Sequence, residues 1–197
     1  MPRLVLGSRN KKKLGELIDL LGDLPMELTD LSPYPHAPEV DETGTTFLDN
    51  AKLKATITAK ALGEWVLGED SGLCVPALDG APGVYSARYA GTHGDDAANN
   101  AKLLEELQGK DRAAYYISTA ALANPEGEIL GTFEGRCWGR IGDHRVGTGG
   151  FGYDPLFIIP ELHATFGELS PLVKQALSHR ARCVGRLRPL LRKLFGI

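Results

Sequence analysis

Cysteine is scarce in this sequence, and the few cysteines are not arranged as metal ligands. Cys74, Cys137 and Cys183 stand singly among 197 residues, with no C-x-x-C pair and no histidine at metal-ligand spacing. This pattern gives no indication of a zinc module. It is typical of buried thiols in a reducing cytoplasm.

Long apolar runs, internal repeats and an excess of positive charge are missing as well. No apolar run approaches the roughly 18 residues of a membrane span, and MPRLVLGSRN holds too short an apolar run for a signal peptide. The net charge of -3 argues against a nucleic-acid coat, so any phosphate binding has to be local. We therefore expect a soluble cytoplasmic protein with no membrane and no nucleic-acid partner.

What the chain does contain is ordinary for a globular protein. Hydrophobic residues make up 43% and charged residues 24%, ordinary globular values that suggest neither a disordered nor a fibrous class. A chain of 197 residues can bury a sizeable core without disulfides. We expect residues 1–197 to form a single domain of two lobes.

The first third of the chain alternates between strand and helix patterns. Arg3–Leu6 is a short apolar run, and from Lys12 apolar residues recur at helical spacing, so a strand, a polar turn and a helix open the chain. A long loop with three prolines, DLSPYPHAPEVDETG, precedes a second helix that begins near Thr46 and ends at Gly63. The stretch WVLGEDSGLCV is typical of strand, turn, strand.

The rest of the chain predicts an α/β sheet that is not purely parallel. AAYYISTAALANPEGEILGTFEGRCWGRI is two extended runs joined by Asn124–Gly127, which indicates an antiparallel hairpin with a type I turn. Further helices are expected from Asp95 or Asp96 through Leu107, after Ser170-Pro171, and from about Ser178 towards Phe195, where Pro189 predicts a kink or an early stop.

The stretch GTGGFGYDP, residues 147–155, satisfies the G-x-G-x-x-G spacing of a dinucleotide-binding loop. That motif needs a following helix, because the helix N-terminus holds the pyrophosphate. Here Pro155 and the apolar run LFIIP follow, which predicts a strand and excludes a dinucleotide loop. Phe151 instead stands among glycines, free to stack on a flat base, an interaction worth about 1–3 kcal/mol.

The stretch SRNKKK lies at the join between a strand and a helix N-terminus. Exposed N–H groups and the helix dipole favour an anion there, and Ser8, Asn10 and Lys13 add a hydroxyl, an amide and an ammonium group. A phosphate would suit this site, although the G-x-x-x-x-G-K-[ST] spacing is absent. A solvated helix start explains the three lysines equally well.

Two further segments carry carboxylates, an amide and a lysine. Asn50 and Lys54 lie at i and i+4 and share a helix face, which in isolation is more often an ordinary exposed face. Glu69 and Asp70 follow an apolar strand, where α/β proteins usually bind ligands. With Glu42 they would make an oxygen-rich site suited to magnesium and substrate phosphates. The alternative is an Asx turn at Asp70.

The segment LVKQALSHRAR adds Lys174, His179 and Arg180, which are all hydrogen-bond donors when the histidine is suitably protonated. A lone His-Arg pair is by default the polar start of a surface helix.

Together these segments resemble the inosine triphosphate pyrophosphatase family, also called the Ham1 or non-canonical purine NTP pyrophosphatase family. The similarity runs through LVLGSRNKKKLGEL, DETGTTFLDNAKLKA, EDSGLCVPALDGAPGVYSARYAG and GTGGFGYDPLF to SHR, nearly the whole chain. It implies an elongated mixed β-sheet flanked by helices, in two lobes with a central cleft for the substrate. It also implies a homodimer that uses Mg2+ to hydrolyse ITP, dITP and XTP to the monophosphate and pyrophosphate, cleansing the nucleotide pool.

Residue by residue, the resemblance implies three groups of contacts. The triphosphate would be held by Ser8, Asn10, Lys13 and Lys54, with Ser71 as a further substrate contact. Glu42 and Asp70 would position magnesium, and Asp70 would accept the proton of the attacking water. The base would be bound by Phe151, Gly152 and Tyr153, with its edge facing Asp154, Lys174, His179 and Arg180.

The chain departs from the family pattern at two places. Family members commonly have Thr-Gly where this chain has Ser8-Arg9, and Asp-Asp where it has Glu69-Asp70. The hydroxyl and the charge are kept, so we expect altered rates before altered function. The rival interpretations are a nucleotide sensor without turnover, which the spare carboxylates argue against, and a Maf-like nucleotide pyrophosphatase, which GTGGFGYDP and SHR argue against.

Overall fold

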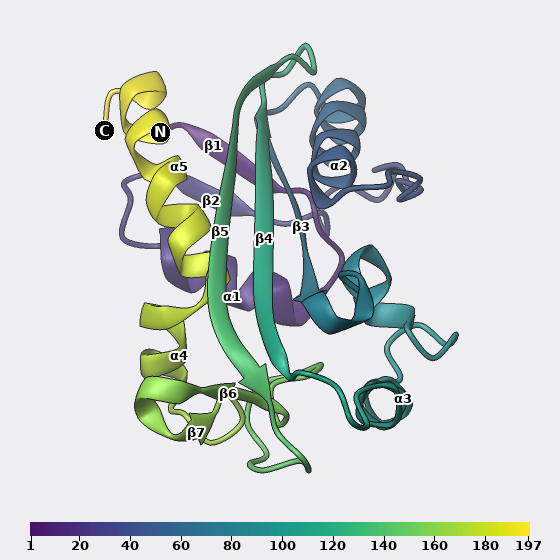
Figure 1. Cartoon of the computed structure of the whole chain (residues 1–197). Coiled ribbons are helices and arrows are strands. Elements are labelled where there is room, and N and C mark those ends of the chain that lie inside the picture. The colour runs from purple at the N-terminus through teal and green to yellow at the C-terminus, as the bar shows by residue number, and fades with distance from the viewer. The chain divides into compact units, whose positions relative to one another are not determined.

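The computed structural model describes residues 1–197 and contains one mixed β-sheet with helices around it (Figure 1). Its seven strands follow the order β2-β1-β3-β4-β5-β6-β7. The β1 strand is parallel to β2 and β3, whereas β6 is antiparallel to β5 and β7, so the predicted mixed α/β sheet is confirmed.

The strands are β1 (Arg3–Leu6), β2 (Glu27–Thr29), β3 (Val66–Cys74), β4 (Ala113–Ala123), β5 (Ile129–Ile141), β6 (Phe157–Ile159) and β7 (Ala164–Thr165). The helices are α1 (Lys11–Leu21), α2 (Phe47–Leu62), α3 (Asp96–Glu106), α4 (Pro171–Leu177) and α5 (His179–Phe195).

The chain divides into two compact units. The first unit comprises Met1–Asp70, Ser118–Gly135 and Arg180–Ile197, and the second comprises Ser71–Ile117 and Arg136–His179. The β3, β4 and β5 strands contribute residues to both units.

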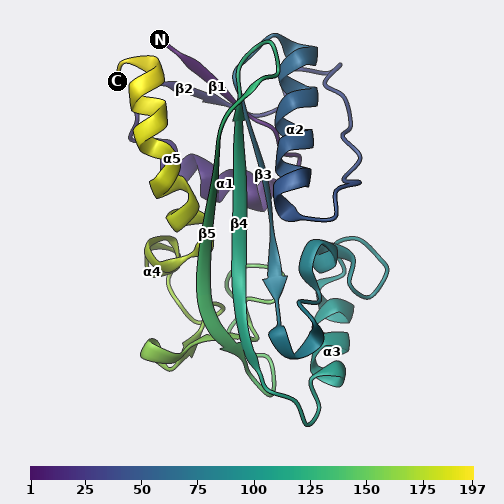
Figure 2. The same cartoon turned by 45° about the horizontal axis from the view of Figure 1, so that its top comes forward.

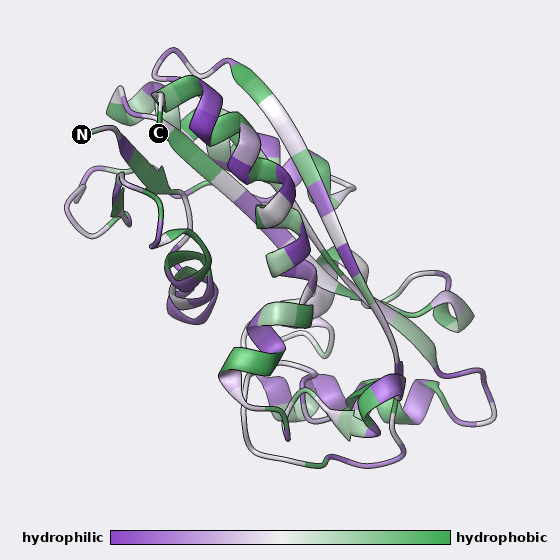
Figure 3. Cartoon of the chain, turned by 90° about the vertical axis from the view of Figure 1, so that its left-hand side faces the viewer, coloured by the Kyte–Doolittle hydropathy of each residue, from purple (hydrophilic) through white to green (hydrophobic).

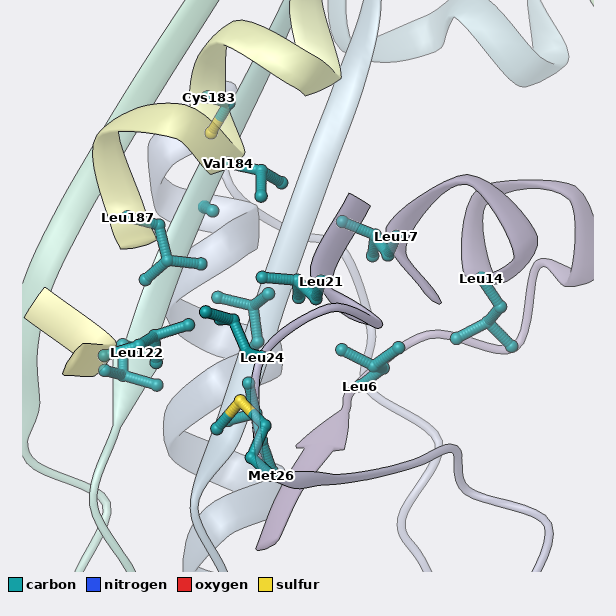
Figure 4. Packing of buried hydrophobic residues seen from close by; sticks show 14 residues of the cluster. Leu6, Leu14, Leu17, Leu21, Leu24, Met26, Leu122, Cys183, Val184 and Leu187 are labelled. Carbon is teal, nitrogen blue, oxygen red and sulfur yellow. The ribbon is translucent and has the colours of Figure 1, made fainter. Parts of the chain in front are cut away.

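In the first unit, alternate side chains of each strand face different helices. Leu4 and Leu6 of β1 pack with the leucines of α1 and α5, whereas Val5 between them packs with the alanines of α2. The same alternation assigns Leu122 of β4 to the first cluster and Ala121 to the second. Figure 2 shows α2 and α5 on opposite sides of the strands, and Figure 4 shows the first cluster from close by. The helices accordingly carry both hydrophobic and hydrophilic residues (Figure 3).

Helix α2 packs directly on the backbone of β3 because the facing residues are small. A Cβ atom at Gly68 would lie 2.2 Å from the carbonyl oxygen of Ala51 and 2.6 Å from the amide nitrogen of Ala55. Both alanines are fully buried. The close approach brings the polar residues of α2 within reach of Glu69 and Asp70, which follow Gly68 in the strand.

The second unit has a core of its own, built around aromatic rings. The ring centroid of Tyr116 on β4 lies 4.6 Å from that of Phe157 and 5.9 Å from that of Phe166. Leu103 and Leu107 from the C-terminal end of α3 belong to the same cluster.

Most of the predicted elements and their caps are confirmed. The side chains of Thr46, Asp95 and Ser170 accept hydrogen bonds from the first turns of α2, α3 and α4, and Gly63 ends α2 in the left-handed conformation. A short turn from Asn124 joins β4 and β5, and a strand, β6, follows the glycine loop as expected.

Other predictions are wrong. WVLGEDSGLCV forms the single strand β3, because Gly68 is a position of close packing and not a turn, and the Asx-turn alternative at Asp70 is therefore excluded. Helix α5 continues through Pro189, so its predicted extent towards Phe195 is confirmed and the early stop, one of the two alternatives at Pro189, is not found. The edge strands β2 and β7 were not predicted, because three and two residues are too few to show a periodic pattern. No helix combines the length and the apolar composition that a membrane span requires.

We predict that Gly68→Ala destabilises the protein by about 1–3 kcal/mol, the usual effect of overpacking a core. The matched control is Gly15→Ala in α1, where an added Cβ meets nothing within 4 Å. That change should stabilise the protein by up to about 1 kcal/mol, because alanine is the better helix former. Urea unfolding measures both, and an unchanged free energy of unfolding for Gly68→Ala would contradict the close approach of α2.

Candidate active site

Two consecutive carboxylates lie buried in the middle of β3. Glu69 is 2% exposed and Asp70 is 4% exposed. Because successive strand residues point to opposite faces, Glu69 lies on the face of Leu67, which packs with α1 and α5. Asp70 lies on the face of Gly68, which packs against α2. Most partners of the two carboxylates therefore differ, although Lys13 lies near both, and a buried charge needs such partners.

The carboxylate of Asp70 is held by two residues one turn apart on α2. Asn50 Nδ2 donates to Asp70 Oδ2 at 3.1 Å, and Lys54 Nζ donates to Asp70 Oδ1 at 3.2 Å. Asn50 Oδ1 in turn accepts from the amide of Gly44 at 2.8 Å, which fixes the orientation of the amide group. The i, i+4 pair predicted on this helix face thus points at the carboxylate and not at solvent.

Lys54 connects three acidic or carbonyl groups. Its Nζ lies 2.7 Å from Glu42 Oε1 and donates to the carbonyl oxygen of Glu69 at 3.1 Å, in addition to its bond with Asp70. Burial acts to lower the pKa of Lys54, but the charges of Asp70 and Glu42 outweigh it and hold the pKa above its ordinary value. Lys54 is therefore a permanent cation.

The carboxylate of Glu69 is held from the other face of the sheet. Arg180 Nε and Ser118 Oγ donate to Glu69 Oε1 at 3.2 and 2.7 Å, and Lys13 Nζ lies 3.7 Å from Oε2. Burial acts to raise the pKa of Glu69, but the charges of Arg180 and Lys13 lower it well below its ordinary value. Arg180, 1% exposed, also donates to Glu16 on α1.

The N-terminal segment SRNKKK divides into a capping part and a site part. The Asn10 side chain accepts from the amides of Lys12 and Lys13 at 3.0 and 3.2 Å, so it caps α1. Ser8 Oγ accepts from the amide of Asn10 at 3.2 Å. Lys11 and Lys12 are exposed, as a solvated helix start would have them. Lys13 reaches the carboxylates, with its Nζ 3.8 Å from Asp70 Oδ1.

The donor set around Lys54 suits magnesium only in the presence of a further ligand. No group of three or more histidine, cysteine or acidic side chains is arranged to hold a metal ion, so the chain offers no complete protein cage. Glu42 and Asp70 are both within 3.2 Å of the same ammonium nitrogen, which places two hard oxygen donors near each other. Magnesium commonly takes one or two carboxylates and completes its shell with waters and phosphate oxygens, and these residues fit that pattern.

In the second unit, Asp154 organises the glycine loop. Asp154 Oδ2 accepts from the amide of Phe151 at 2.8 Å and from Lys174 Nζ at 2.7 Å. A Cβ at Gly150 would lie 2.0 Å from the same oxygen, so only glycine fits there. Lys174 Nζ lies 4.8 Å from the ring centroid of Phe151, and the ring that was expected to be free thus has an ammonium group over it.

Two further predicted residues are buried in the second unit. Tyr153 is 3% exposed, and its hydroxyl donates to the carbonyl oxygen of Ser86 at 2.9 Å. Burial and the neighbouring Tyr89 raise the pKa of Tyr153. His179 stacks on Tyr116 with ring centroids 4.8 Å apart and ring planes 14° apart. These contacts fix both rings.

The predicted residues are thus divided between the two units. The first unit contains Ser8, Asn10, Lys13, Glu42, Lys54, Asp70 and Arg180, and the second contains Ser71, Phe151, Gly152, Tyr153, Asp154, Lys174 and His179. Arg180, which the resemblance places at the base edge, is bonded to Glu69 and Glu16.

Sequence reasoning missed several supporting residues. Ser118 and Glu16 bind Glu69 and Arg180, but single polar residues in an apolar strand or an amphipathic helix carry no signal of their own. Asp96 and Asn100 on α3 bond to Gly152 of the glycine loop. The tandem Asn99-Asn100 in the interior of a predicted helix, where asparagine is unfavourable, was the available signal for the second pair.

The chain is similar to proteins of known classification over nearly its whole length. The Ham1 family model matches residues 4–190. A dITP/XTP pyrophosphatase of Rhodopirellula baltica is 54% identical over 194 residues, covering 97% of this chain and 93% of the relative. A dITP/XTP pyrophosphatase of Streptomyces coelicolor is 44% identical over 201 residues and covers 100% of both chains.

Solved structures agree with this assignment. A Ham1 protein from Coxiella burnetii has a TM-score of 0.90 and 39% identity, covering 98% of this chain and 100% of that one. A nucleoside-triphosphatase, or dITP/XTP pyrophosphatase, from Mycobacterium abscessus has a TM-score of 0.78 and 45% identity, covering 95% and 99%. With its buried carboxylate and lysine cluster and its aromatic glycine loop, this chain belongs to the Ham1 family.

Proposed function

We propose that the protein is a magnesium-dependent nucleoside triphosphate pyrophosphatase that hydrolyses ITP, dITP and XTP to the monophosphate and pyrophosphate. The relatives named dITP/XTP pyrophosphatase support the substrate class. The observation that carries the chemistry is the buried carboxylate of Asp70, held by Asn50 and Lys54 with Lys13 close by. A fixed carboxylate between two lysines suits hydrolysis of a phosphate chain.

The lysines bind and neutralise the triphosphate in this proposal. Lys13 is 17% exposed and Lys54 is 12% exposed at the side chain, so each ammonium group is desolvated yet not sealed off. Ser8 adds a hydroxyl beside the N-terminus of α1, where the helix dipole favours an anion. Positioning and neutralisation of charge do most of the work in phosphoryl chemistry.

Asp70 would act as the general base. The oxygen of a water molecule forms a bond to the α-phosphorus, the bond from that phosphorus to the bridging oxygen breaks, and pyrophosphate leaves. Asp70 accepts the proton that the water loses. Asn50 and Lys54 fix the two carboxylate oxygens, so the base does not have to be oriented during the reaction.

Magnesium would be held by Glu42 and Asp70 together with phosphate oxygens, and it would supply positive charge to the leaving pyrophosphate. The charge of the acidic residues supports the proposal of such a cation. Glu42, Glu69 and Asp70 oppose a polyanionic substrate, and Lys13 and Lys54 are already engaged with them.

Glu69 and Arg180 would support the base catalyst. Arg180 is bonded to two carboxylates and is fully buried, which leaves it poorly placed to form new bonds with a purine. We therefore assign it the task of keeping Glu69 ionised and in place. Glu69 then stabilises Lys13, which lies between it and Asp70.

The second unit would bind the base. Phe151 offers a stacking surface, and Lys174, His179 and Asp154 supply polar groups for the base edge. Hypoxanthine and xanthine present a carbonyl at C6, which suits a donor such as His179, whereas adenine presents an amino donor. Two facing donors leave both groups without a partner, and such a mismatch can reject a substrate by about 10⁴-fold.

The homodimer and the cytoplasmic location that the family resemblance implies remain part of the proposal. Size-exclusion chromatography with light scattering tests the dimer independently of activity.

We predict that Asp70→Asn lowers kcat for ITP by about 10²–10⁴-fold, the usual contribution of a general base, while KM changes little. The amide keeps the shape of the carboxylate and loses its charge. Asp19→Asn, the same change at an exposed carboxylate of α1, is the matched control and should leave both constants unchanged. Near-normal turnover by the Asp70 variant would rule out its role as the base.

We predict that competing ITP and XTP are hydrolysed in strong preference to ATP when all are present with Mg2+. The products should be the monophosphate and pyrophosphate, which ion-exchange chromatography separates from the diphosphate and phosphate. GTP belongs in the same assay, because guanine shares the C6 carbonyl and differs at its 2-amino group. Equal rates for ITP and ATP would exclude base selection through the C6 carbonyl, and binding without products would indicate a sensor.

A further inference from the structure

Helix α3 holds both backbone groups of one residue in the glycine loop. Asp96 Oδ2 accepts from the amide of Gly152 at 2.9 Å, and Asn100 Nδ2 donates to the carbonyl oxygen of Gly152 at 2.9 Å. Asp96 and Asn100 lie at i and i+4 and therefore project from the same face of the helix. All three residues belong to the second unit.

The held residue lies between the two aromatic residues of the loop. Phe151 is bonded through its amide to Asp154, and Tyr153 is bonded through its hydroxyl to Ser86. Gly152 has a φ of 60°, a conformation that a glycine loop leaves readily when nothing holds it. The two bonds from α3 fix the backbone at this point of the loop.

Asn100 makes a contact outside its own helix. Its side chain is 1% exposed, and asparagine is a poor residue for a helix interior. The Nδ2 group donates to two carbonyl oxygens, those of Asp96 and Gly152, and the buried Oδ1 has no hydrogen-bond partner. A buried acceptor without a partner is unfavourable, so the residue must serve a contact outside the helix, and that contact is with Gly152.

We propose that Asp96 and Asn100 are positioning residues for the base end of the nucleotide. By fixing Gly152 they fix the ring of the preceding Phe151, on which the base stacks. The inference rests on the proposed function and adds α3 to the residues that determine its specificity. A loop that is ordered before binding loses less conformational entropy when the base stacks on it, so the contact affects binding of the base more than the chemistry at the phosphates.

The test compares Asp96→Ala and Asn100→Leu with wild type. We expect each variant to raise KM for ITP by about tenfold, the effect of losing one buried hydrogen bond, with kcat within about threefold of wild type. The preference for ITP over ATP should fall by a similar factor. Asp96→Asn keeps an oxygen at the accepting position and should restore KM.

Asp95→Ala is the matched control, because Asp95 precedes Asp96 at the same helix start. Asp95 Oδ1 accepts from the amide of Ala98 at 2.9 Å and caps α3 without touching the loop. Its loss should lower Tm by about 2–4 °C, the usual effect of losing a cap in a protein of this size, and leave KM unchanged. If Asp95→Ala raises KM as much as Asp96→Ala does, the effect reflects the stability of α3 and the proposal is overturned.

Calorimetric titration with inosine, which carries no phosphate, separates this inference from the proposed function. Wild type should bind inosine about tenfold more tightly than Asp96→Ala and Asn100→Leu, whether or not any triphosphate is hydrolysed. If wild type hydrolyses ITP and the variants match it in KM, selectivity and inosine binding, only the role of α3 fails. If wild type hydrolyses no triphosphate, the proposed function fails, and the inosine titration still decides on α3. Should Asn100→Leu not fold, the two Asp96 variants decide alone.

Discussion

The candidate site depends on one constraint, namely that β3 carries two charged residues in succession through the interior. Glu69 and Asp70 are nearly inaccessible to solvent. An unpaired ion in such a position costs several kcal/mol even after the protein relaxes, so each carboxylate has to be neutralised locally. Alternation along the strand sends the two groups to opposite faces. The helices on both faces therefore have to supply cations and donors at one level of the strand.

That requirement explains which residues occur on the surrounding helices. On α2, small residues allow the helix to approach Gly68, and the polar residues Asn50 and Lys54 follow at a spacing of one turn. Near the start of α5, the guanidinium group of Arg180 donates a hydrogen bond to Glu69. A glutamate fits this position because Oε1 accepts from both Arg180 and Ser118. Glu69, which departs from the family's Asp-Asp pattern, thus finds hydrogen-bond partners for its longer side chain.

Most helices and strands could be predicted from the sequence, because capped helices and alternating apolar residues leave clear patterns. Thr46, Asp95 and Ser170 were identifiable as caps for this reason. The strand through Glu69 and Asp70 was interpreted as broken, since adjacent charges beside a glycine normally indicate a turn. Residues distant in the sequence bind the two carboxylates and so allow a continuous strand in place of the turn. A single sequence does not show these contacts.

The sequence predicted which residue types form the candidate site, but it predicted less well which of those residues contact one another. Lys13, Lys54 and Asp70 were assigned to one site from the sequence. In the structure Asp70 Oδ1 lies 3.8 Å from Lys13 Nζ and 3.2 Å from Lys54 Nζ. Arg180 was expected beside a base and lies beside carboxylates. The chain alone specifies that a guanidinium follows His179. The packing of α5 against β3 and α1 decides which charges it meets.

The two units solve the same electrostatic problem in the same way. In each, a buried aspartate is paired with a lysine from a helix, Asp70 with Lys54 and Asp154 with Lys174. Buried ion pairs add little to stability, since apolar residues of similar size would often serve as well or better. What such pairs do provide is a charged group whose position is fixed in advance. The buried pairs of both units are therefore better explained as fixed charged groups than as contributions to stability.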